Sequence, residues 1–351
     1  MKNIMLAMSG GVDSSVAYIL LKDSFGESKI IGATMSLFDG GGEAAEEARA
    51  VTGRFGIPHE VFDLKERFRQ EVIDKFVQSY ANGETPNPCV ACNKYIKFGA
   101  FFEAASALNC GLMATGHYAR VEYDAGSGRF LLKKAVSAKD QSYVLYNLTQ
   151  EQLGRTVFPL GNLEKKQVRE IALGHGLANS EKPDSQDICF IPDGDYARYI
   201  ANYTGRVFEG GVIADRNGKI LGRHSGIINY TVGQRKGLGL SAPTPLYVIG
   251  KDAQTNTVIA GENSELFSDR LIAGEVNWIA FGKLGGTLRL YARTRYSQPE
   301  QPCTVSPIDE NKASVIFDSP QRAITPGQSV VFYDGDVVVG GGTIQSEINN
   351  C

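Results

Sequence analysis

The sequence contains no apolar run long enough to span a membrane, no signal-peptide-like segment and no run of lysine or arginine residues. From the first two absences we expect neither a membrane partner nor a secreted precursor. Six cysteines in 351 residues are too few for a disulfide scaffold, which favours the reducing cytoplasm. The formal net charge of −3 argues against bulk electrostatic attraction of nucleic acid, so a nucleic acid would need a local, shaped surface.

The chain is longer than one hydrophobic core usually supports, so two or three domains are expected. Its first part alternates short apolar strands with longer helical stretches, which predicts an α/β domain with a parallel sheet covered on both faces. Beyond about residue 205, short strands broken by Gly, Asn and Asp turns predict small antiparallel sheets or barrels. We expect an α/β domain at 1–204, a central β-rich domain at 205–270 and a C-terminal β-barrel at 271–351.

Several individual elements can be predicted from the same pattern. The predicted strands cover 3–8, 30–36, 59–63 and 112–115, and the predicted helices cover 14–22, 43–55, 65–80 and 163–176. Residues 118–134 alternate around the turn Asp-Ala-Gly-Ser-Gly at 124–128, which indicates a β-hairpin.

A glycine turn follows the first strand, with the sequence Ser-Gly-Gly-Val-Asp-Ser at 9–14. Adjacent glycines allow successive N–H groups to point at one anion, and the following helix adds the positive end of its dipole. The turn lacks the Gly-Lys-Ser/Thr of a Walker A motif and is not Gly-x-Gly-x-x-Gly. It resembles instead the PP-loop of ATP pyrophosphatases, which cleave ATP between its α and β phosphates. The alternative is a glycine turn in an ordinary strand–helix unit.

Ligands of parallel sheets bind at the carboxyl ends of the strands, where 9–13, Met35 and Gly116 all fall. Alone, Met35 would be a core residue and Gly116 a turn residue. Their shared position makes both of them candidates for a nucleotide site.

Cys89 and Cys92 form a Cys-x-x-Cys within the sequence Thr-Pro-Asn-Pro-Cys-Val-Ala-Cys at 85–92. We expect the prolines to prevent helix until about Cys92, from which a helix continues through Phe102. Cys-x-x-Cys at a helix N-terminus has a depressed thiol pKa and serves as a nucleophile, a redox pair or half of a metal site. Cys189 is a candidate third member, and the alternative for all three is a buried, inert cysteine.

Three polar stretches are ordinary surface when considered alone. Lys-Asp-Gln-Ser at 139–142 is typical of a solvated helix start. Gly-Gln-Arg-Lys-Gly-Leu-Gly at 233–239 could follow a phosphate backbone, and Arg-Thr-Arg-Tyr at 293–296 combines cations with an aromatic ring suited to unstacked bases.

Together these stretches resemble the bacterial tRNA-specific 2-thiouridylases from end to end. The matching motifs lie at 8–15, 85–93, 114–119, 139–143, 184–190, 230–239, 293–296 and 323–328. They are more specific than the PP-loop, which asparagine, argininosuccinate, GMP and NAD synthetases also carry.

The resemblance implies thiolation of C2 of the wobble uridine of tRNA, with ATP and a sulfur-donor protein as partners. Adenylation at O2 would make AMP the leaving group and open C2 to sulfur. Asp13 would position Mg²⁺. The residues implied to hold ATP are Ala7, Met8, Ser9, Gly10, Gly11, Val12, Asp13, Ser14, Met35 and Gly116.

The resemblance also assigns roles to the cysteines and to the tRNA-contacting residues. Cys92 matches the catalytic nucleophile and Cys189 the cysteine that receives persulfide sulfur, with a transient Cys92–Cys189 disulfide as product. The target base would meet Asn87, Pro88 and Cys89. Further tRNA contacts are implied for His117, Lys139, Asp140, Gln141, Arg295, Tyr296 and Gln328.

One position departs from the family pattern. The best-known members carry Asp three residues before the nucleophile, whereas this chain has Cys89, and a thiol does not replace a carboxylate in proton transfer. Cys89, Cys92 and Cys189 supply three soft ligands, as in tRNA thiolases whose 4Fe–4S cluster is held by three cysteines. A zinc site would want a fourth ligand, and none is obvious. Persulfide and iron–sulfur chemistry both remain open.

Two other function classes compete with tRNA thiolation. A PP-loop amide synthetase acting on a small molecule is one, but no glutaminase signature is present and the three cysteines would have no use. A non-enzymatic RNA-binding module is the other, and the intact PP-loop argues against it.

Overall fold

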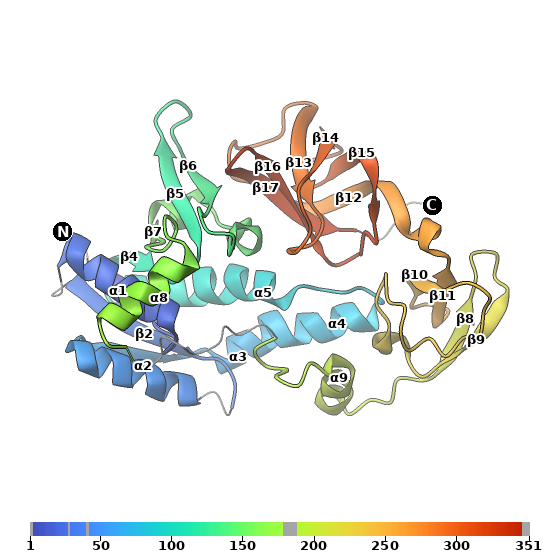
Figure 1. The fold of residues 1–351 in the computed structure, drawn as a ribbon, viewed down its shortest axis with the longest axis horizontal. Coiled ribbons are helices and arrows are strands. Elements are labelled where there is room, and N and C mark those ends of the chain that lie inside the picture. Colours follow the sequence, from blue (N-terminus) through green and yellow to red (C-terminus); the bar gives the residue numbers. More distant parts are fainter. Residues whose placement is uncertain (1–2, 27–28, 40–41, 178–187, 346–351) are drawn as a thin grey trace.

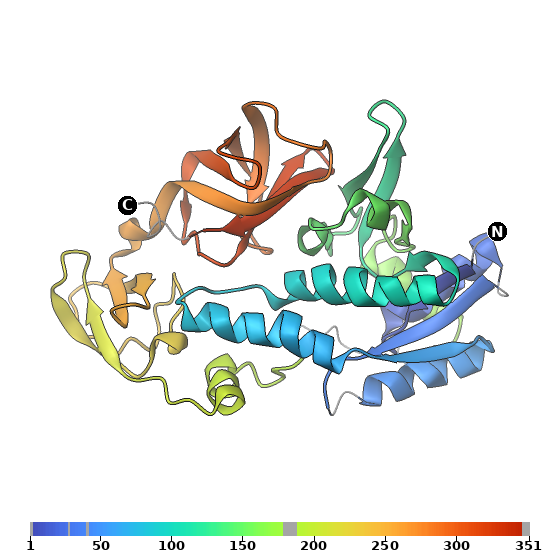
Figure 2. The same cartoon turned by 180° about the vertical axis from the view of Figure 1, so that it is seen from behind.

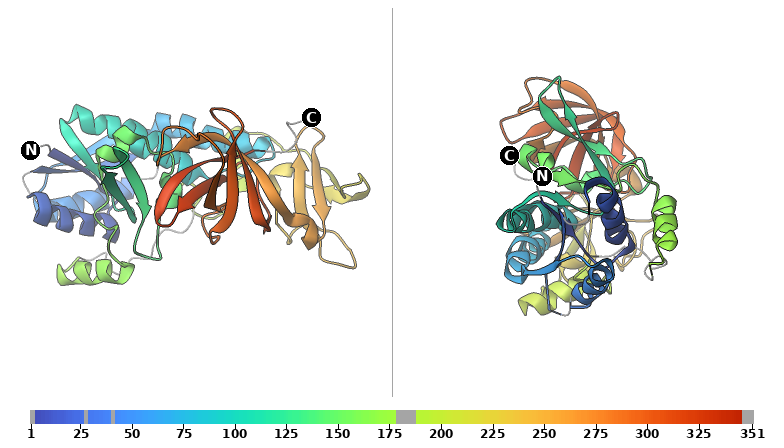
Figure 3. Two further views of the ribbon diagram at one scale, coloured as in Figure 1. Left: turned by 90° about the horizontal axis from the view of Figure 1, so that it is seen from above. Right: turned by 90° about the vertical axis from the view of Figure 1, so that its left-hand side faces the viewer.

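The computed structural model describes residues 3–26, 29–39, 42–177 and 188–345 (Figure 1). Of the predicted motif at 184–190, residues 184–187 lie outside the described residues. None of the helices in the described ranges is both long enough and apolar enough to cross a bilayer. The left-hand view of Figure 3 shows the N-terminal sheet and the central sheet at opposite ends of the long axis, with the C-terminal strands between them.

The N-terminal part contains a parallel sheet, as predicted. Its five strands have the order β3-β2-β1-β4-β7, and they cover His59–Asp63, Ile30–Ser36, Asn3–Ala7, Cys110–Ala114 and Thr156–Val157. Both faces are buried, because Met5 packs into one core cluster while its neighbours Ile4 and Leu6 pack into another. Burial on both faces explains why the inner strands β1, β2 and β4 are nearly continuous apolar runs.

Helices cover this sheet and extend from it. They are α1 (Val12–Phe25), α2 (Gly42–Phe55), α3 (Lys65–Phe68), η2 (Arg69–Asp74), α4 (Lys75–Ala81), α5 (Pro88–Ala91), η3 (Cys92–Ala100), α6 (Phe101–Ala107), α7 (Gln150–Gly154), α8 (Lys165–Gly174) and α9 (Tyr196–Thr204). Segments η2 and η3 are π-helical and continue the helices before and after them, although η3 contains a kink at Gly99. The two long helical stretches, 65–81 and 88–107, run side by side beneath the C-terminal strands (Figure 2). Short 3₁₀ turns lie at η4 (Ser142–Leu145), η5 (Ile227–Asn229) and η6 (Asn263–Leu266).

The second helical stretch begins at Pro88, so our prediction of a non-helical segment until about Cys92 is wrong. Proline is tolerated in the first helical position because its missing N–H has no intrahelical partner there. The side chain of Asn87 caps the helix by accepting a hydrogen bond from the Cys89 amide at 3.0 Å. Cys89 and Cys92 therefore lie one turn apart on a single helix.

A central sheet follows, with the order β10-β11-β8-β9. Its strands are β8 (Gly211–Ala214), β9 (Ile220–His224), β10 (Tyr247–Asp252) and β11 (Thr257–Gly261). The sheet is mixed rather than purely antiparallel as predicted, because β11 pairs parallel with β8. The long connection between β9 and β10 carries the chain back across the sheet, which permits that pairing.

The C-terminal strands close into the predicted β-barrel. They are β12 (Phe267–Trp278), β13 (Leu288–Arg293), β14 (Gln301–Pro307), β15 (Ala313–Arg322), β16 (Ser329–Asp334) and β17 (Val337–Ile344). They pair antiparallel in the order β12-β15-β14-β13-β16-β17, and β12 also pairs with β17 to complete the ring.

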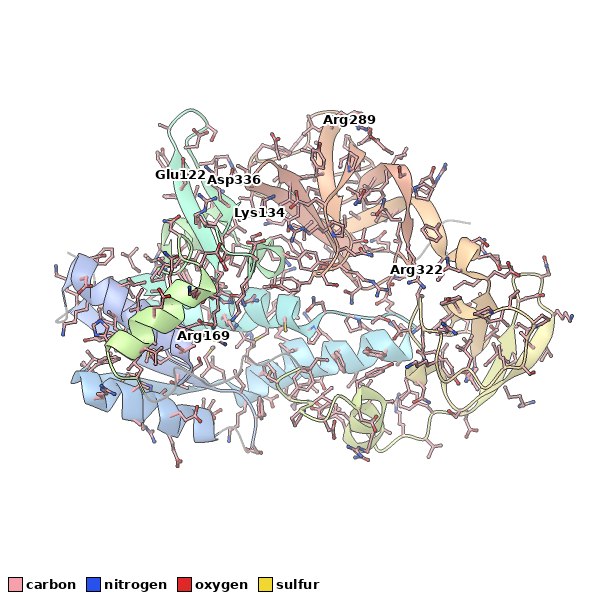
Figure 4. The ribbon with its side chains drawn as sticks, viewed as in Figure 1. Glu122, Lys134, Arg169, Arg289, Arg322 and Asp336 are labelled. Atoms are coloured by element: carbon pink, nitrogen blue, oxygen red, sulfur yellow. The ribbon has the colours of Figure 1, made fainter. Side chains whose placement is uncertain are left out.

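The predicted hairpin at 118–134 is present as β5 (Ala119–Asp124) and β6 (Arg129–Lys134). Its position was not predicted, because β6 pairs with β17 of the barrel through Lys133 and Leu132. An ion pair between Arg120 and Asp336 at 2.7 Å reinforces this junction. Figure 4 shows Glu122, Lys134 and Asp336 gathered where the hairpin meets the barrel. The hairpin and the C-terminal barrel thus belong to one sheet.

Candidate nucleotide and thiol site

The predicted phosphate loop joins β1 to α1 and leaves the first turn of that helix without a side-chain cap. Gly10 has a φ of +74°, which favours glycine, and a Cβ there would collide with the side chain of Glu47. The Ser14 hydroxyl donates a hydrogen bond to the Gly11 carbonyl at 3.0 Å. The turn therefore has the backbone geometry of an anion cradle at a helix N-terminus.

The other predicted nucleotide residues lie at the same edge of the sheet. Gly116 follows β4 and packs against the start of α1, where a Cβ would lie 3.1 Å from the Ser14 amide nitrogen. Met35 lies near the end of β2, next to β1 in the sheet, and packs against both neighbouring core clusters. The structure thus brings the three predicted segments to one edge.

Asp13 is the centre of a charged cluster at this edge. Its carboxylate accepts hydrogen bonds from the Tyr118 hydroxyl at 2.8 Å, from the Lys165 ammonium at 2.8 Å and from the Lys139 ammonium at 3.1 Å. Lys139, which we predicted to contact tRNA, therefore lies at the phosphate loop. Sequence reasoning missed Lys165 and Tyr118, because neither stands in a motif with a phosphate-binding signature.

The three predicted thiols converge at the helical stretch 88–107, which carries Cys89 and Cys92 and is called the cysteine helix below. Cys89 and Cys189 are exposed, whereas Cys92 is half-buried. The segment that carries Cys189 is anchored by Phe190, whose ring packs edge-on against Phe68 and Phe76 at 5.7 and 5.6 Å between centroids. Cys92 packs against the same core cluster. This packing places Cys189 beside the cysteine helix despite their separation in sequence.

The thiol pKa values run opposite to our expectation of a depressed pKa. Burial raises the pKa of Cys92 to about 12, the charge of Lys97 opposes that rise, and the nearby Cys189 and Cys89 add to it. Desolvation of the thiol likewise raises the pKa of Cys189, although the residue as a whole is exposed, and Cys89 contributes in the same direction. Desolvation outweighs the helix dipole here because the dipole acts mainly at exposed first-turn positions. Cys92 is therefore a neutral thiol near pH 7.

These mutual effects show that the three thiols are close to one another. Even so, the described residues hold no group of three or more His, Cys, Asp or Glu side chains that could bind a metal ion. The donor set has the chemistry of a cluster site, but the side chains as they stand do not form one.

His117 and Lys97 lie between the nucleotide edge and the thiols. His117 is buried, and its Nδ1 is 2.8 Å from the Thr115 hydroxyl. Its Nε2 is 3.4 Å from the ammonium of Lys97. Burial and the charge of Lys97 lower the pKa of His117 well below its usual value, so the ring is neutral. A tRNA contact by His117 would therefore not be a charge contact.

The barrel holds the segment before Cys89. The side chain of Gln328 donates to the Thr85 carbonyl at 2.7 Å, and the Thr85 amide donates to the Pro326 carbonyl at 2.9 Å. Gln328 was predicted to contact tRNA, and in the structure it positions the loop that leads to Asn87 and Pro88.

The remaining predicted tRNA residues also make internal contacts. The Tyr296 hydroxyl donates to the Asp140 carbonyl at 2.9 Å, and the Gln141 side chain accepts from the Tyr118 amide at 3.0 Å. The guanidinium of Arg295 donates to the Thr325 hydroxyl at 2.7 Å, which ties it to the barrel. Their roles toward tRNA stay predictions.

Comparison with known proteins identifies the family to which the chain is similar. Three family models match successive parts of the chain: "tRNA methyl transferase HUP domain" at 2–193, "tRNA methyl transferase PRC-barrel domain" at 197–262 and "Aminomethyltransferase beta-barrel domain" at 268–344. The tRNA-specific 2-thiouridylase MnmA of Clostridioides difficile is 48% identical over 359 residues, covering 99% of each chain. The enzyme of the same name from Acetivibrio thermocellus is 46% identical, covering 98% of this chain and 99% of its own.

A solved structure with partial similarity is the U34-tRNA thiolase NcsA from Methanococcus maripaludis with its 4Fe–4S cluster. It is 16% identical, with a TM-score of 0.36, and covers 57% of this chain and 67% of its own. A likeness this weak carries no argument about a cluster here. The identity to MnmA over nearly the full length of both chains shows that the chain belongs to the tRNA-specific 2-thiouridylase family.

Proposed function

We propose that the chain is a tRNA-uridine 2-sulfurtransferase that thiolates the wobble uridine of tRNA at the expense of ATP. The observation that carries this proposal is the presence of an anion cradle and three converging thiols in a chain that matches tRNA-specific 2-thiouridylases over almost its whole length. A PP-loop amide synthetase would have no role for those thiols.

The first step activates the base. The uracil O2 attacks the α-phosphate of ATP, so that an O2–phosphorus bond forms and pyrophosphate leaves. The loop at 9–14 would bind the phosphates through its backbone N–H groups, with Gly116 and Met35 at the nucleotide edge. The adenylated C2 is a better electrophile because AMP, rather than oxide, becomes its leaving group.

Asp13 is suited to hold Mg²⁺ with the triphosphate, because carboxylate oxygens are preferred ligands of this ion. Its present partners are Lys139, Lys165 and Tyr118. The ion would therefore compete with two ammonium groups for one carboxylate. Bound there, it would neutralise negative charge on the phosphates.

The second step transfers sulfur. A donor protein would load Cys189 as a persulfide, which its exposed position allows. The terminal sulfur attacks C2, the C2–O2 bond breaks and AMP departs with O2. Cys92 then loses its proton and attacks the Cys189 sulfur, the S–S bond to the base breaks, and the released thiouridine takes up a proton, which leaves a Cys92–Cys189 disulfide. A thiol reductant must return two electrons to that disulfide before the next turnover.

An iron–sulfur carrier is the second candidate, favoured by the convergence of Cys89, Cys92 and Cys189. A 4Fe–4S cluster bound by three thiolates would supply a free iron to hold the attacking sulfur. Cys92 would have to lose its proton, and the three side chains would have to rearrange, because they do not form a metal-binding group as they stand.

The tRNA would lie against a groove beside the cysteine helix. The groove has a volume of about 180 Å³ and lies between the two long helical stretches and the barrel. Its lining includes Asn87, Pro88 and Lys75, and the ammonium of Lys75 lies 3.8 Å above the ring of Tyr95. Cationic and aromatic groups together suit an unstacked anticodon nucleotide.

The decisive test of the function is pyrophosphate release from ATP in the presence and absence of tRNA. We expect release only with tRNA that has an unmodified wobble uridine, accompanied by AMP and, with a sulfur source, by 2-thiouridine in the digested tRNA. Release that needs no tRNA, or that responds to an amino acid instead, contradicts the proposal.

The sulfur carrier is tested by Cys89→Ser, with Cys92→Ser as the matched variant. If sulfur travels as a persulfide, Cys89→Ser retains most transfer while Cys92→Ser loses it. If a cluster is needed, both variants lose transfer. Iron and sulfide analysis of protein purified without oxygen, together with its visible spectrum, separates the two cases independently of activity.

A further inference from the structure

The segment Cys92–Ala100 is π-helical apart from a kink at Gly99, whose φ and ψ are −98° and −105°. Lys97 lies before this kink, five residues after Cys92, and its charge reaches the Cys92 thiol. A π-helix pairs residue i with residue i+5, so positions five apart lie on one face. In an α-helix the same two positions would diverge by about 140° around the axis. π-Helical segments are often found at functional sites.

The ammonium of Lys97 points toward the nucleotide edge. It lies 3.4 Å from Nε2 of His117, the residue that follows Gly116. Gly116 in turn packs on the first turn of α1, within reach of the Ser14 amide. Lys97 therefore connects the cysteine helix to the edge of the sheet where the phosphates would lie.

His117 orients Lys97 without neutralising it. The ring is buried and uncharged, so Nε2 accepts a hydrogen bond from the ammonium while Nδ1 carries the proton and faces the Thr115 hydroxyl. In the part of the chain that the structure describes, no carboxylate forms an ion pair with Lys97. Lys139 and Lys165, in contrast, are both paired with Asp13.

The charge of Lys97 also acts on the sulfur side. It opposes the rise that burial causes in the pKa of Cys92, and it does the same for Cys189. A half-buried ammonium that has no counter-carboxylate among the described residues thus lies between the phosphate edge and the attacking sulfur.

We propose that Lys97 is a catalytic residue that binds a non-bridging oxygen of the α-phosphate, both in ATP and in the adenylated uridine. This inference rests on the proposed function and assigns a contact within it. When O2 attacks the α-phosphate, the ammonium offsets charge on the phosphoryl oxygens. When sulfur attacks C2 and the C2–O2 bond breaks, it stabilises the additional negative charge of the departing AMP. In a partly desolvated site such a fixed charge acts strongly.

The first experiment measures tRNA-dependent pyrophosphate release by Lys97→Met and Lys97→Arg. We expect Lys97→Met to lower kcat/KM about 100-fold, as for loss of one preorganised donor. Lys97→Arg keeps the charge and should remain within about 10-fold of the wild type. Lys166→Met is the control, because the Lys166 side chain is 88% exposed and pairs with Glu170 at 3.8 Å, and we expect near-wild-type release.

A second measurement tests direct contact. The two diastereomers of ATP with sulfur on the α-phosphate should react at different rates with the wild type, and Lys97→Met should lose part of that discrimination. Non-additivity of the two changes is the signature of a contact and is not expected from a loss of folding.

The outcomes separate this inference from the function it rests on. A wild-type protein that releases no pyrophosphate with tRNA contradicts the proposed function. If the wild type is active and Lys97→Met matches it, Lys97 does not bind the α-phosphate. If the variant releases pyrophosphate normally but forms less 2-thiouridine per pyrophosphate, Lys97 serves the thiols instead, and the phosphate contact is overturned.

Discussion

The ammonium of Lys165 lies 2.8 Å from Oδ1 of Asp13, although the two residues are 152 positions apart. Lys165 opens α8, which packs against α1. The ammonium of Lys165 lies beside the phosphate loop, where it can bind the negatively charged triphosphate of ATP. In the absence of ATP, the ion pair with Asp13 holds the ammonium in that position.

We predict that Lys165→Met raises the KM for ATP about 10-fold, because one charge-assisted contact to phosphate is lost. Steady-state pyrophosphate release at saturating tRNA measures this. Lys166→Met is the control, because the Lys166 side chain is 88% exposed and pairs only loosely with Glu170 at 3.8 Å. Equal KM values for the two variants would exclude a role for Lys165 at the phosphates.

Gly327 of the barrel packs against Glu84 and Thr85, in the loop that leads to Cys89, and so tests how the barrel holds that loop. Its φ of +87° disfavours other residues, and a Cβ there would lie 3.0 Å from Cβ of Glu84 and 3.1 Å from the Thr85 amide nitrogen. We predict that Gly327→Ala lowers the free energy of unfolding by about 1–3 kcal/mol, measured in urea, and slows thiolation. Gly335→Ala shares the positive φ but meets nothing within 4 Å, so it should affect stability less and leave thiolation unchanged.

Lys251 predicts a pH dependence of stability. Its ammonium is buried, donates to the Tyr230 carbonyl at 2.8 Å and lies 5.8 Å from the centroid of Tyr80. Burial lowers the pKa of Lys251 from 10.5 to about 8, although Glu84 opposes this shift. Between about pH 8 and pH 10.5 the unfolded chain binds more protons at this lysine than the folded chain does. The contribution of Lys251 to the free energy of unfolding therefore rises with pH over this range and is lost as the pH falls through about 8.

The measurement compares urea unfolding of the wild type and Lys251→Met. From about pH 7.5 to about pH 9.5, the free energy of unfolding of the wild type should gain about 2 kcal/mol relative to the variant. Groups common to both proteins cancel in this difference. A constant difference across that range would show that Lys251 titrates normally in the folded protein.

Much of the fold follows from local patterns in the sequence. The strands at Ile30–Ser36 and His59–Asp63 match the predicted bounds. Ile30–Ser36 is a mostly buried apolar run, and His59–Asp63 is a shorter, partly exposed strand at the edge of the sheet. The barrel was predictable because glycine, asparagine and aspartate mark its turns. The start of the helix at Pro88 was not, since proline both interrupts a helix and begins one.

Part of the candidate site could likewise be predicted from the sequence, and part could not. The roles of the loop at 9–14 and of the cysteines could be predicted from residue type and spacing. The role of Lys97 could not be predicted in this way. Lys97 and Cys92, five residues apart, share a face in a π-helix, whereas the α-helical period expected from sequence places them on different faces. The high pKa of Cys92 was also out of reach, because desolvation depends on the core that forms around the thiol.

The pairing of β6 with β17 also governs how the protein folds as it is made. The hairpin β5–β6 leaves the ribosome early, whereas Val337–Ile344, the last strand among the described residues, is synthesised much later. Until then the outer edge of β6 has no strand to bond with, and an open edge can recruit other chains. A ribosome that stalls after the phosphate loop and all three thiols have emerged would therefore release a chain prone to aggregation.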